Sequence, residues 1–183
     1  MLCSRNPNKL EELRAALPGW EIAQLDGYGY PPEDGDTYYA NARAKALYGR
    51  DVAPVDAWVV GEDSGIEVDA LGGEPGVRSA RWADEGRQHL ALLERLAGEA
   101  DRSARMIAHL VAIAPDGREF DAVGVLDGKI ANEPRGTGGF GYDPVFVPEG
   151  EMQTVAELGD DWKRANSHRG RAAAALRAAI ASS

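Results

Sequence analysis

Two adjacent carboxylates, Glu62 and Asp63, follow directly on an apolar run and are themselves followed by Ser64 and Gly65. In α/β proteins, groups that handle ligands are commonly placed where strands end. Adjacent carboxylates repel each other, so a divalent cation or a proton held between them would relieve the repulsion. Taken alone, the segment is more typical of a solvated turn after a strand, and the other polar segments of the chain decide between these interpretations.

A second acidic segment, residues 33–36, stands just before a predicted helix. We expect its Glu33 to approach Glu62 and Asp63 and to complete a metal site of three carboxylates. Carboxylates, with water and phosphate oxygens in the remaining positions, suit Mg²⁺. The alternative interpretation is that the acidic loop is only solvated surface.

Two lysines indicate where an anion would bind. Lys9 lies in the first turn of a helix that begins after Asn6, where free N–H groups attract anions and a lysine is otherwise unfavourable. Lys45 shares one face of the next predicted helix with Tyr38 and Asn41, a combination that is unusual for packing alone. Both lysines are also compatible with ordinary helix surface.

A glycine-rich segment, residues 136–144, formally matches the pattern G-x-G-x-x-G. Pro144 and Pro148 oppose the helix that must follow this pattern in a dinucleotide-binding fold. The glycines that flank Phe140 and Tyr142 instead indicate backbone close to a flat ligand, with exposed rings that stack on a base. A turn packed around its own aromatic rings is the alternative.

Cations also gather near the start of the last predicted helix. Lys163 precedes this helix, and His168, Arg169 and Arg171 follow its N-cap, Ser167. Because cations in a first turn oppose the helix dipole, we expect an anion or a carbonyl-rich ligand nearby. The sequence contains no recognisable Ser/His/Asp or Cys nucleophile pattern, no Cys/His zinc spacing and no Walker A motif.

The composition describes an ordinary globular protein of 183 residues, for which we expect a single domain over residues 1–183. The net charge of −10 argues against a general nucleic-acid binder or a protein of anionic membranes. Cys3 is the one cysteine, which excludes an intrachain disulfide. No apolar run approaches the roughly 20 residues of a membrane span, and no signal-peptide core is recognisable, so we expect a cytoplasmic protein.

The elements that must position these groups alternate between helix and strand. Apolar spacing and capping residues predict helices over residues 7–17, 37–48, 86–97 and 167–181, the second capped by Asp36 and ended by Gly49. Strands are predicted over residues 1–4, 20–25, 57–60, 105–114, 119–130 and 145–147, and loops over 26–35, 65–76 and 136–150. With a hairpin at residues 115–117, this order predicts a mixed α/β fold.

Together, these segments resemble the inosine/xanthosine triphosphate pyrophosphatase family, which hydrolyses non-standard purine nucleoside triphosphates such as ITP, dITP and XTP. The matching motifs are Ser4-x-Asn6-x-x-Lys9-x-x-Glu12, Asn41-Ala42-x-x-Lys45-Ala46, Glu62-Asp63-Ser64-Gly65, Asp69-Ala70-Leu71-Gly72-Gly73-x-Pro75-Gly76-Val77-x-Ser79-Ala80-Arg81, Gly138-Gly139-Phe140-Gly141-Tyr142-Asp143-Pro144 and Ser167-His168-Arg169-Gly170. They occur in the order typical of the family and extend over nearly the whole chain.

The resemblance implies a mixed twisted sheet with flanking helices, in two lobes around a deep cleft. It further implies a homodimer and a Mg²⁺-dependent cut between the α- and β-phosphates. Asp63 would accept the proton and bind metal, and Glu33 and Glu62 would be the other metal-site carboxylates. The expected substrate contacts are Ser4, Asn6, Lys9, Lys45 and Ser64 around the phosphates, and Phe140, Gly141, Tyr142, Asp143, Lys163, His168 and Arg169 around the base and sugar, with Asn41 as a further substrate-binding residue.

The chain departs from the family pattern in a few places. The family usually has Asp at the position of Glu62, often has Gly at that of Arg5, and commonly has Glu at that of Ala40.

Two other functions stay open. One is a pyrophosphatase that acts on standard or modified pyrimidine triphosphates, and the other is a nucleotide-binding protein without catalytic activity.

Overall fold

The computed structural model describes residues 1–25, 29–84 and 86–183, so part of the predicted loop 26–35 lies outside the described residues. A mixed sheet forms its centre, with the spatial order β1-β2-β4-β5-β6 and β3 paired to β2. β1 runs parallel to β2, and the other pairs are antiparallel. The strands are β1 (Leu2–Cys3), β2 (Val59–Val68), β3 (Pro75–Gly76), β4 (Ser103–Ile113), β5 (Glu119–Ile130) and β6 (Phe146–Pro148).

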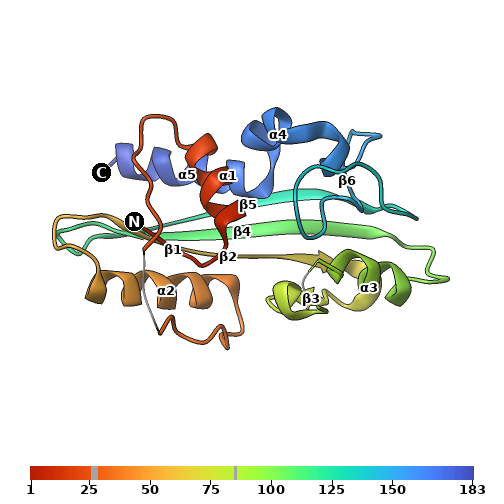
Figure 1. Ribbon diagram of the computed structural model, residues 1–183, viewed down its shortest axis with the longest axis horizontal. Coiled ribbons are helices and arrows are strands. Elements are labelled where there is room, and N and C mark those ends of the chain that lie inside the picture. Colours follow the sequence, from red (N-terminus) through yellow and green to blue (C-terminus); the bar gives the residue numbers. More distant parts are fainter. Residues whose placement is uncertain (26–28, 85) are drawn as a thin grey trace.

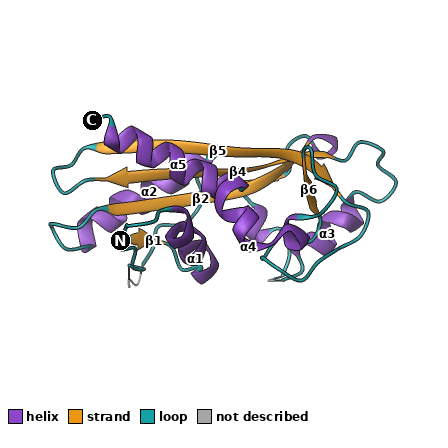
Figure 2. Ribbon diagram, turned by 90° about the horizontal axis from the view of Figure 1, so that it is seen from above, coloured by secondary structure: helices purple, strands orange, loops and turns teal. Residues whose placement is uncertain are grey.

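Helices cover both faces of this sheet, which confirms the predicted α/β fold. Figure 1 shows α2 on one face, α1, α4 and α5 on the other, and α3 beside the far end of the sheet. Figure 2 shows the same arrangement from above, with β2, β4 and β5 running side by side. The helices are α1 (Pro7–Ala16), α2 (Tyr38–Val52), α3 (Gln88–Arg95), α4 (Val155–Asn166) and α5 (His168–Ala181), with short 3₁₀ turns η1 (Asp69–Leu71) and η2 (Ser79–Arg81).

The prediction of a turn at residues 62–65 is wrong, because β2 continues through this segment to Val68. β2 pairs with β4 along its whole length, with Glu62 opposite Leu110 and Asp63 opposite His109. Local composition favoured a turn, but this long-range pairing satisfies the backbone groups of the segment. The two carboxylates therefore lie within a strand, where consecutive side chains point to opposite faces of the sheet.

Several other boundaries differ from the sequence-based expectations. The N-cap of α2 is Thr37, whose hydroxyl accepts from the Ala40 N–H, in place of Asp36, and the helix continues past Gly49 to Val52. The predicted strand 20–25 reduces to an isolated bridge between Leu2 and Gln24. α4 was missed altogether. The remaining predicted strands and helices are present with boundaries shifted by a few residues.

Capping by Asn6 and Ser167 is confirmed. The Asn6 side chain accepts from the Asn8 N–H, and the Ser167 hydroxyl accepts from the Gly170 N–H. Pro7 occupies the first turn of α1, as expected from its fixed φ and missing N–H. These caps fix where α1 and α5 begin, and so where their first-turn cations lie.

Two glycines bring helices directly onto strand backbones. A Cβ atom at Gly61 would lie 1.9 Å from the Ala42 carbonyl oxygen of α2, and one at Gly124 would lie 2.0 Å from the His168 carbonyl oxygen of α5. Buried apolar side chains fill the space on both faces. Ala42 and Ala46 of α2 belong to one buried cluster with Val59 of β2, and Ala172 and Leu176 of α5 belong to another with Leu110 of β4. Close packing of this kind sets the distance of α2 and of α5 from the sheet.

No helix in the described parts of the chain has both the length and the apolar character that crossing a membrane requires.

Candidate active site

Asp63 lies on the α2 face of β2, between a lysine and an amide. Lys45 Nζ donates to Asp63 Oδ1 at 3.1 Å and to the Glu62 carbonyl oxygen at 2.9 Å. Asn41 Nδ2 donates to Asp63 Oδ2 at 3.0 Å. Burial raises the pKa of Asp63, and Lys45 offsets only part of that effect. The structure thus brings together Asp63, Asn41 and Lys45, as the sequence predicted.

Glu33 reaches the same lysine from the loop before α2. Its Oε1 forms an ion pair with Lys45, and its Oε2 accepts from Arg81 Nη1 at 2.7 Å. Burial alone would raise the pKa of Glu33, but Lys45 and, to a lesser degree, Lys9 and Arg81 lower it. Asn41 ties this loop to α2, because its Oδ1 accepts from the Gly35 N–H at 2.9 Å. Glu33 and Asp63 therefore approach each other through Lys45, as expected.

Glu62 points to the opposite face of the sheet and is fully buried. Its carboxylate pairs with Lys9 Nζ at 2.6 Å and with Arg169, whose Nη2 lies 3.0 Å from Oε1. Burial would raise the pKa of Glu62, but Lys9 and Arg169 outweigh burial and lower it. These partners anchor α1 and α5 to β2.

The structure does not bring Glu62 together with Glu33 and Asp63, as the predicted metal site of three carboxylates requires. Nowhere in the described parts of the chain do three or more Asp, Glu, His or Cys side chains form a group that could hold a metal ion. Because side chains alternate along β2, Glu62 cannot join Asp63 on the α2 face. Glu33 and Asp63 remain as neighbouring carboxylates.

Glu12 is the site residue that sequence reasoning left without a role. From α1 it pairs with both Arg169 and Lys163. Lys163 Nζ also contacts Asp143 Oδ2 at 2.8 Å. The attraction of Arg169 and Lys163 outweighs burial and lowers the pKa of Glu12. In the first motif Glu12 stands three residues after Lys9, which is about one helical turn. This spacing places both side chains on one face of the helix and could have identified Glu12 as a site residue.

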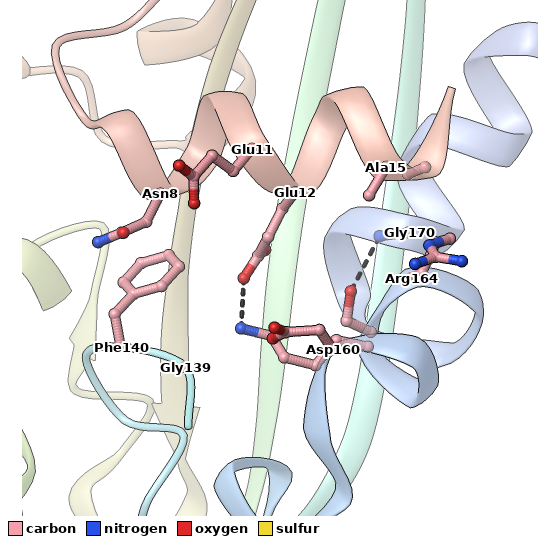
Figure 3. Close-up of a pocket in the computed structure, with 12 residues that line it drawn as sticks. Asn8, Glu11, Glu12, Ala15, Gly139, Phe140, Asp160, Arg164 and Gly170 are labelled. Atoms are coloured by element: carbon pink, nitrogen blue, oxygen red, sulfur yellow. Dashed lines mark hydrogen bonds and ion pairs between the residues drawn. The ribbon is translucent and has the colours of Figure 1, made fainter. Parts of the chain in front are cut away.

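A pocket of about 410 Å³ opens beside this ion-pair network. Figure 3 shows Phe140 on its loop, facing Asn8 and Glu11 of α1, and the dashed line from Glu12 marks the ion pair with Lys163. Lys163 Nζ lies 5.0 Å from the centroid of the Phe140 ring. An aromatic ring with cations on one side gives a surface on which a flat, electron-rich ring can stack.

Of the other residues in the glycine-rich loop, some leave room for a ligand and others pack against the protein. Gly141 has a φ of +64°, with open space around its Cα, so the loop can approach a ligand there. Tyr142 is buried, and its hydroxyl donates to the Ser79 carbonyl oxygen at 2.8 Å. The expectation that Tyr142 is an exposed stacking ring is therefore wrong. Asp143 Oδ2 accepts from the Phe140 N–H at 2.8 Å and holds the loop around that ring.

Small polar groups complete the site. Ser4 Oγ accepts from the Asn6 N–H at 3.2 Å at the turn between β1 and α1. Ser64 Oγ accepts from Arg169 Nη2 at 3.0 Å. His168 is buried, and its Nδ1 has no hydrogen-bond partner among the residues that the structure describes. Burial and the Arg169 charge lower the pKa of His168 to about 3. His168 is therefore neutral near pH 7 and offers one ring N–H as a donor.

Comparison with known proteins places this site in a family. The family model described as Ham1 family matches residues 1–179. A dITP/XTP pyrophosphatase from Deinococcus deserti is 41% identical over 98% of this chain and 88% of its own length. The solved HAM1 protein from Coxiella burnetii is 32% identical with a TM-score of 0.85, and covers 100% of this chain and 98% of that chain. A nucleoside-triphosphatase described as a dITP/XTP pyrophosphatase, from Mycobacterium abscessus, is 40% identical with a TM-score of 0.73 and 96% coverage of both chains.

The depressed pKa of His168 predicts a specific loss of stability in acid. An unfolded histidine takes up its proton near pH 6.5, whereas His168 in the folded protein does so only near pH 3. Between these values the unfolded chain binds one more proton at this position, so the free energy of unfolding falls as the pH is lowered through the window. We expect His168→Gln to remove up to about 1.4 kcal/mol per pH unit of this dependence.

Urea unfolding of the wild type and of His168→Gln, measured at several pH values between 4 and 7, checks this expectation. The difference in unfolding free energy between the two proteins should change steadily in favour of the variant as the pH is lowered. A difference that is constant across the window would contradict a neutral buried His168.

Proposed function

The chain belongs to the Ham1 family, and from that premise we propose that it hydrolyses non-standard purine nucleoside triphosphates, ITP, dITP and XTP, to the nucleoside monophosphate and pyrophosphate. The observation that carries this proposal is the buried Asp63 carboxylate, held between Lys45 and Asn41 beside Glu33. It is a nucleoside triphosphate pyrophosphohydrolase, like the relatives named dITP/XTP pyrophosphatase.

The triphosphate binds around the N-terminus of α1 and the middle of β2. Lys9 and Lys45 supply positive charge there, and Ser4, Asn6 and Ser64 supply polar groups. Both lysines pair with carboxylates in this structure, so the phosphates must compete with Glu62 and Glu33 for them. The competition is favourable because a triphosphate carries about four negative charges near the partial positive charge of the helix N-terminus.

Glu33 and Asp63 fit a Mg²⁺ ion. Both carboxylates contact Lys45 Nζ, which is evidence that this point favours positive charge. Hard carboxylate oxygens are the ligands that Mg²⁺ takes from proteins, usually one or two of them, with phosphate and water in the other positions. Glu62 is excluded from this role by its direction. When bound, Mg²⁺ would neutralise charge on the phosphates and on the pyrophosphate leaving group.

Asp63 accepts the proton of the attacking water. A general base works best when its pKa lies nearer the operating pH, and burial raises the pKa of Asp63 from its usual value. Lys45 and Asn41 hold both carboxylate oxygens in a fixed direction, which keeps the base oriented without protonating it. Asn41 is thus a positioning residue in this account.

The purine base binds in the pocket beside Phe140. Every base has a flat face that can stack on this ring, so stacking does not distinguish one base from another. The enzyme must therefore recognise its substrates through the groups at the edge of the purine. Lys163, Arg169 and the single N–H of His168 are donors, which suit the 6-carbonyl of hypoxanthine and xanthine. Adenine presents a 6-amino group there and would leave buried donors unpaired, and such mismatches are discriminated strongly.

We further propose, from the same family resemblance, that the enzyme is a cytoplasmic homodimer and that it removes non-standard triphosphates from the nucleotide pool. Its net charge of −10 supports a small-molecule substrate over nucleic acid.

A substrate panel tests the proposed activity. We expect Mg²⁺-dependent release of pyrophosphate from ITP, dITP and XTP, and much slower release from ATP, GTP and dTTP, because adenine lacks the 6-carbonyl, guanine carries a 2-amino group, and thymine is a smaller single ring. The measurement is pyrophosphate release with and without Mg²⁺. A preference for dTTP or UTP would favour a pyrimidine enzyme, and no release from any triphosphate would favour a binding protein.

Replacement of Asp63 by Asn tests its role as the base. The amide keeps the shape of the carboxylate but cannot take a proton, so we expect the turnover number to fall at least about a hundredfold. Nucleotide binding, measured by isothermal titration, should be largely retained. Near-normal turnover in Asp63→Asn would exclude Asp63 as the proton acceptor.

A further inference from the structure

Arg81, the last residue of η2, forms two hydrogen bonds with Glu33. Its Nη1 donates to Glu33 Oε2 at 2.7 Å, and its Nη2 donates to the Glu33 carbonyl oxygen at 2.6 Å. The two contacts fix both the carboxylate and the backbone of a loop that has no regular secondary structure. η2 is therefore joined to the loop before α2 at the residue that faces Asp63 across Lys45.

The two cations that share the Glu33 carboxylate are not equally replaceable. Lys45 is buried, with a side chain 7% exposed, and it also holds Asp63 and the Glu62 carbonyl oxygen. The Arg81 side chain is 49% exposed. Among the described residues, its side chain makes hydrogen bonds only to Glu33. A guanidinium that can return to water loses little when it leaves a carboxylate, whereas displacing Lys45 would leave the buried Asp63 carboxylate without its cation.

We propose that Arg81 is a positioning residue that competes with a divalent cation for the Glu33 carboxylate. The inference rests on the proposed function, because it concerns the same carboxylate that would bind Mg²⁺. Oε2 of Glu33 is the oxygen at issue, and a cation that binds it must release Arg81 Nη1. The Nη2 contact to the backbone can remain, so the loop stays in place while the carboxylate changes partner.

This competition has a consequence for the order of binding. While Arg81 is bound to Oε2, a divalent cation gains less binding free energy from Glu33 than it would from an unpaired carboxylate, because Arg81 must first be released. Phosphate oxygens supply the ligands and negative charge that compensate for this loss. The cation is therefore expected to bind weakly by itself and more tightly together with a triphosphate.

Titration with Mn²⁺ in the absence of nucleotide, followed by electron paramagnetic resonance of the unbound ion, tests the proposal. Arg81→Ala should bind Mn²⁺ about two- to fivefold more tightly than the wild type, the range expected for loss of a half-exposed ion pair. Arg81→Lys, which keeps the charge but not the two-point contact, should lie between them. Arg78→Ala removes the same charge from an exposed position three residues earlier, and should match the wild type.

A double-mutant cycle assigns the effect to Glu33. In a Glu33→Gln background, Arg81→Ala should leave the Mn²⁺ affinity unchanged, because the disputed carboxylate is gone. Unchanged or weaker Mn²⁺ binding by Arg81→Ala would overturn the proposal, since Arg81 would then only hold Glu33 in place for the cation. Circular dichroism at the titration temperature confirms that each variant is folded.

The outcomes also separate this proposal from the proposed function. If the wild type releases pyrophosphate from dITP only with Mg²⁺ and Arg81→Ala leaves the Mn²⁺ affinity unchanged, the competition is refuted and the activity stands. If wild-type pyrophosphate release does not depend on a divalent cation, the assignment of Glu33 and Asp63 to the metal fails first, and the proposed competition fails with it.

Discussion

The pairing of β2 with β4 is the interaction on which the arrangement of the whole site depends. Because β2 runs unbroken from Val59 to Val68, two carboxylates adjacent in sequence are directed to opposite faces of the sheet. Asp63 meets α2 and the loop before it, while Glu62 meets α1 and α5. One strand thus serves two charge clusters, and the charge of Lys9, which pairs with Glu62, also favours the charged forms of Glu33 and Asp63. The glycines at 61 and 124 reinforce this, since they let α2 and α5 lie directly on the strand backbones.

Both clusters bury charge at a density that folding alone would not favour. Arg169 is 2% exposed and meets Glu12 and Glu62, and Lys45, 6% exposed, meets Glu33 and Asp63. Buried ion pairs seldom add net stability, because their attraction must first offset the loss of hydration. Their value here is positional. The same side chains that hold each other in this structure are those that a triphosphate and a 6-carbonyl purine would engage, so the fold keeps its binding groups oriented and desolvated in advance.

Features with a local physical cause could be predicted from the sequence, and those with a distant cause could not. Asn6 and Ser167 cap helices through contacts within three residues, and the hairpin strands 103–113 and 119–130 are joined by a short turn. The turn expected at Glu62-Asp63 failed because pairing with a strand more than forty residues away decides it. α4 was not predicted because Gly159, a poor helix former, lies in its middle, and at φ +80° it kinks the helix there. Tyr142 resembled a stacking ring, but its direction depends on Ser79, which is distant in sequence. The site residues were identified from the polar motifs together with the family that these motifs resemble, and only the structure separated Glu62 from Glu33 and Asp63.

The central claim is that Asp63 and Glu33 act on the metal, whereas Glu62, on the other face of β2, does not. The Mg²⁺ dependence of pyrophosphate release by Glu62→Gln tests this claim most directly. Glu62 holds Lys9 and Arg169, so the variant should bind dITP more weakly, while the Mg²⁺ concentration needed for half-maximal rate at saturating nucleotide stays close to that of the wild type. Glu33→Gln in the same assay should require more Mg²⁺. If Glu62→Gln raises the Mg²⁺ requirement as much as Glu33→Gln does, the two carboxylates of β2 act together on the metal and the account is contradicted.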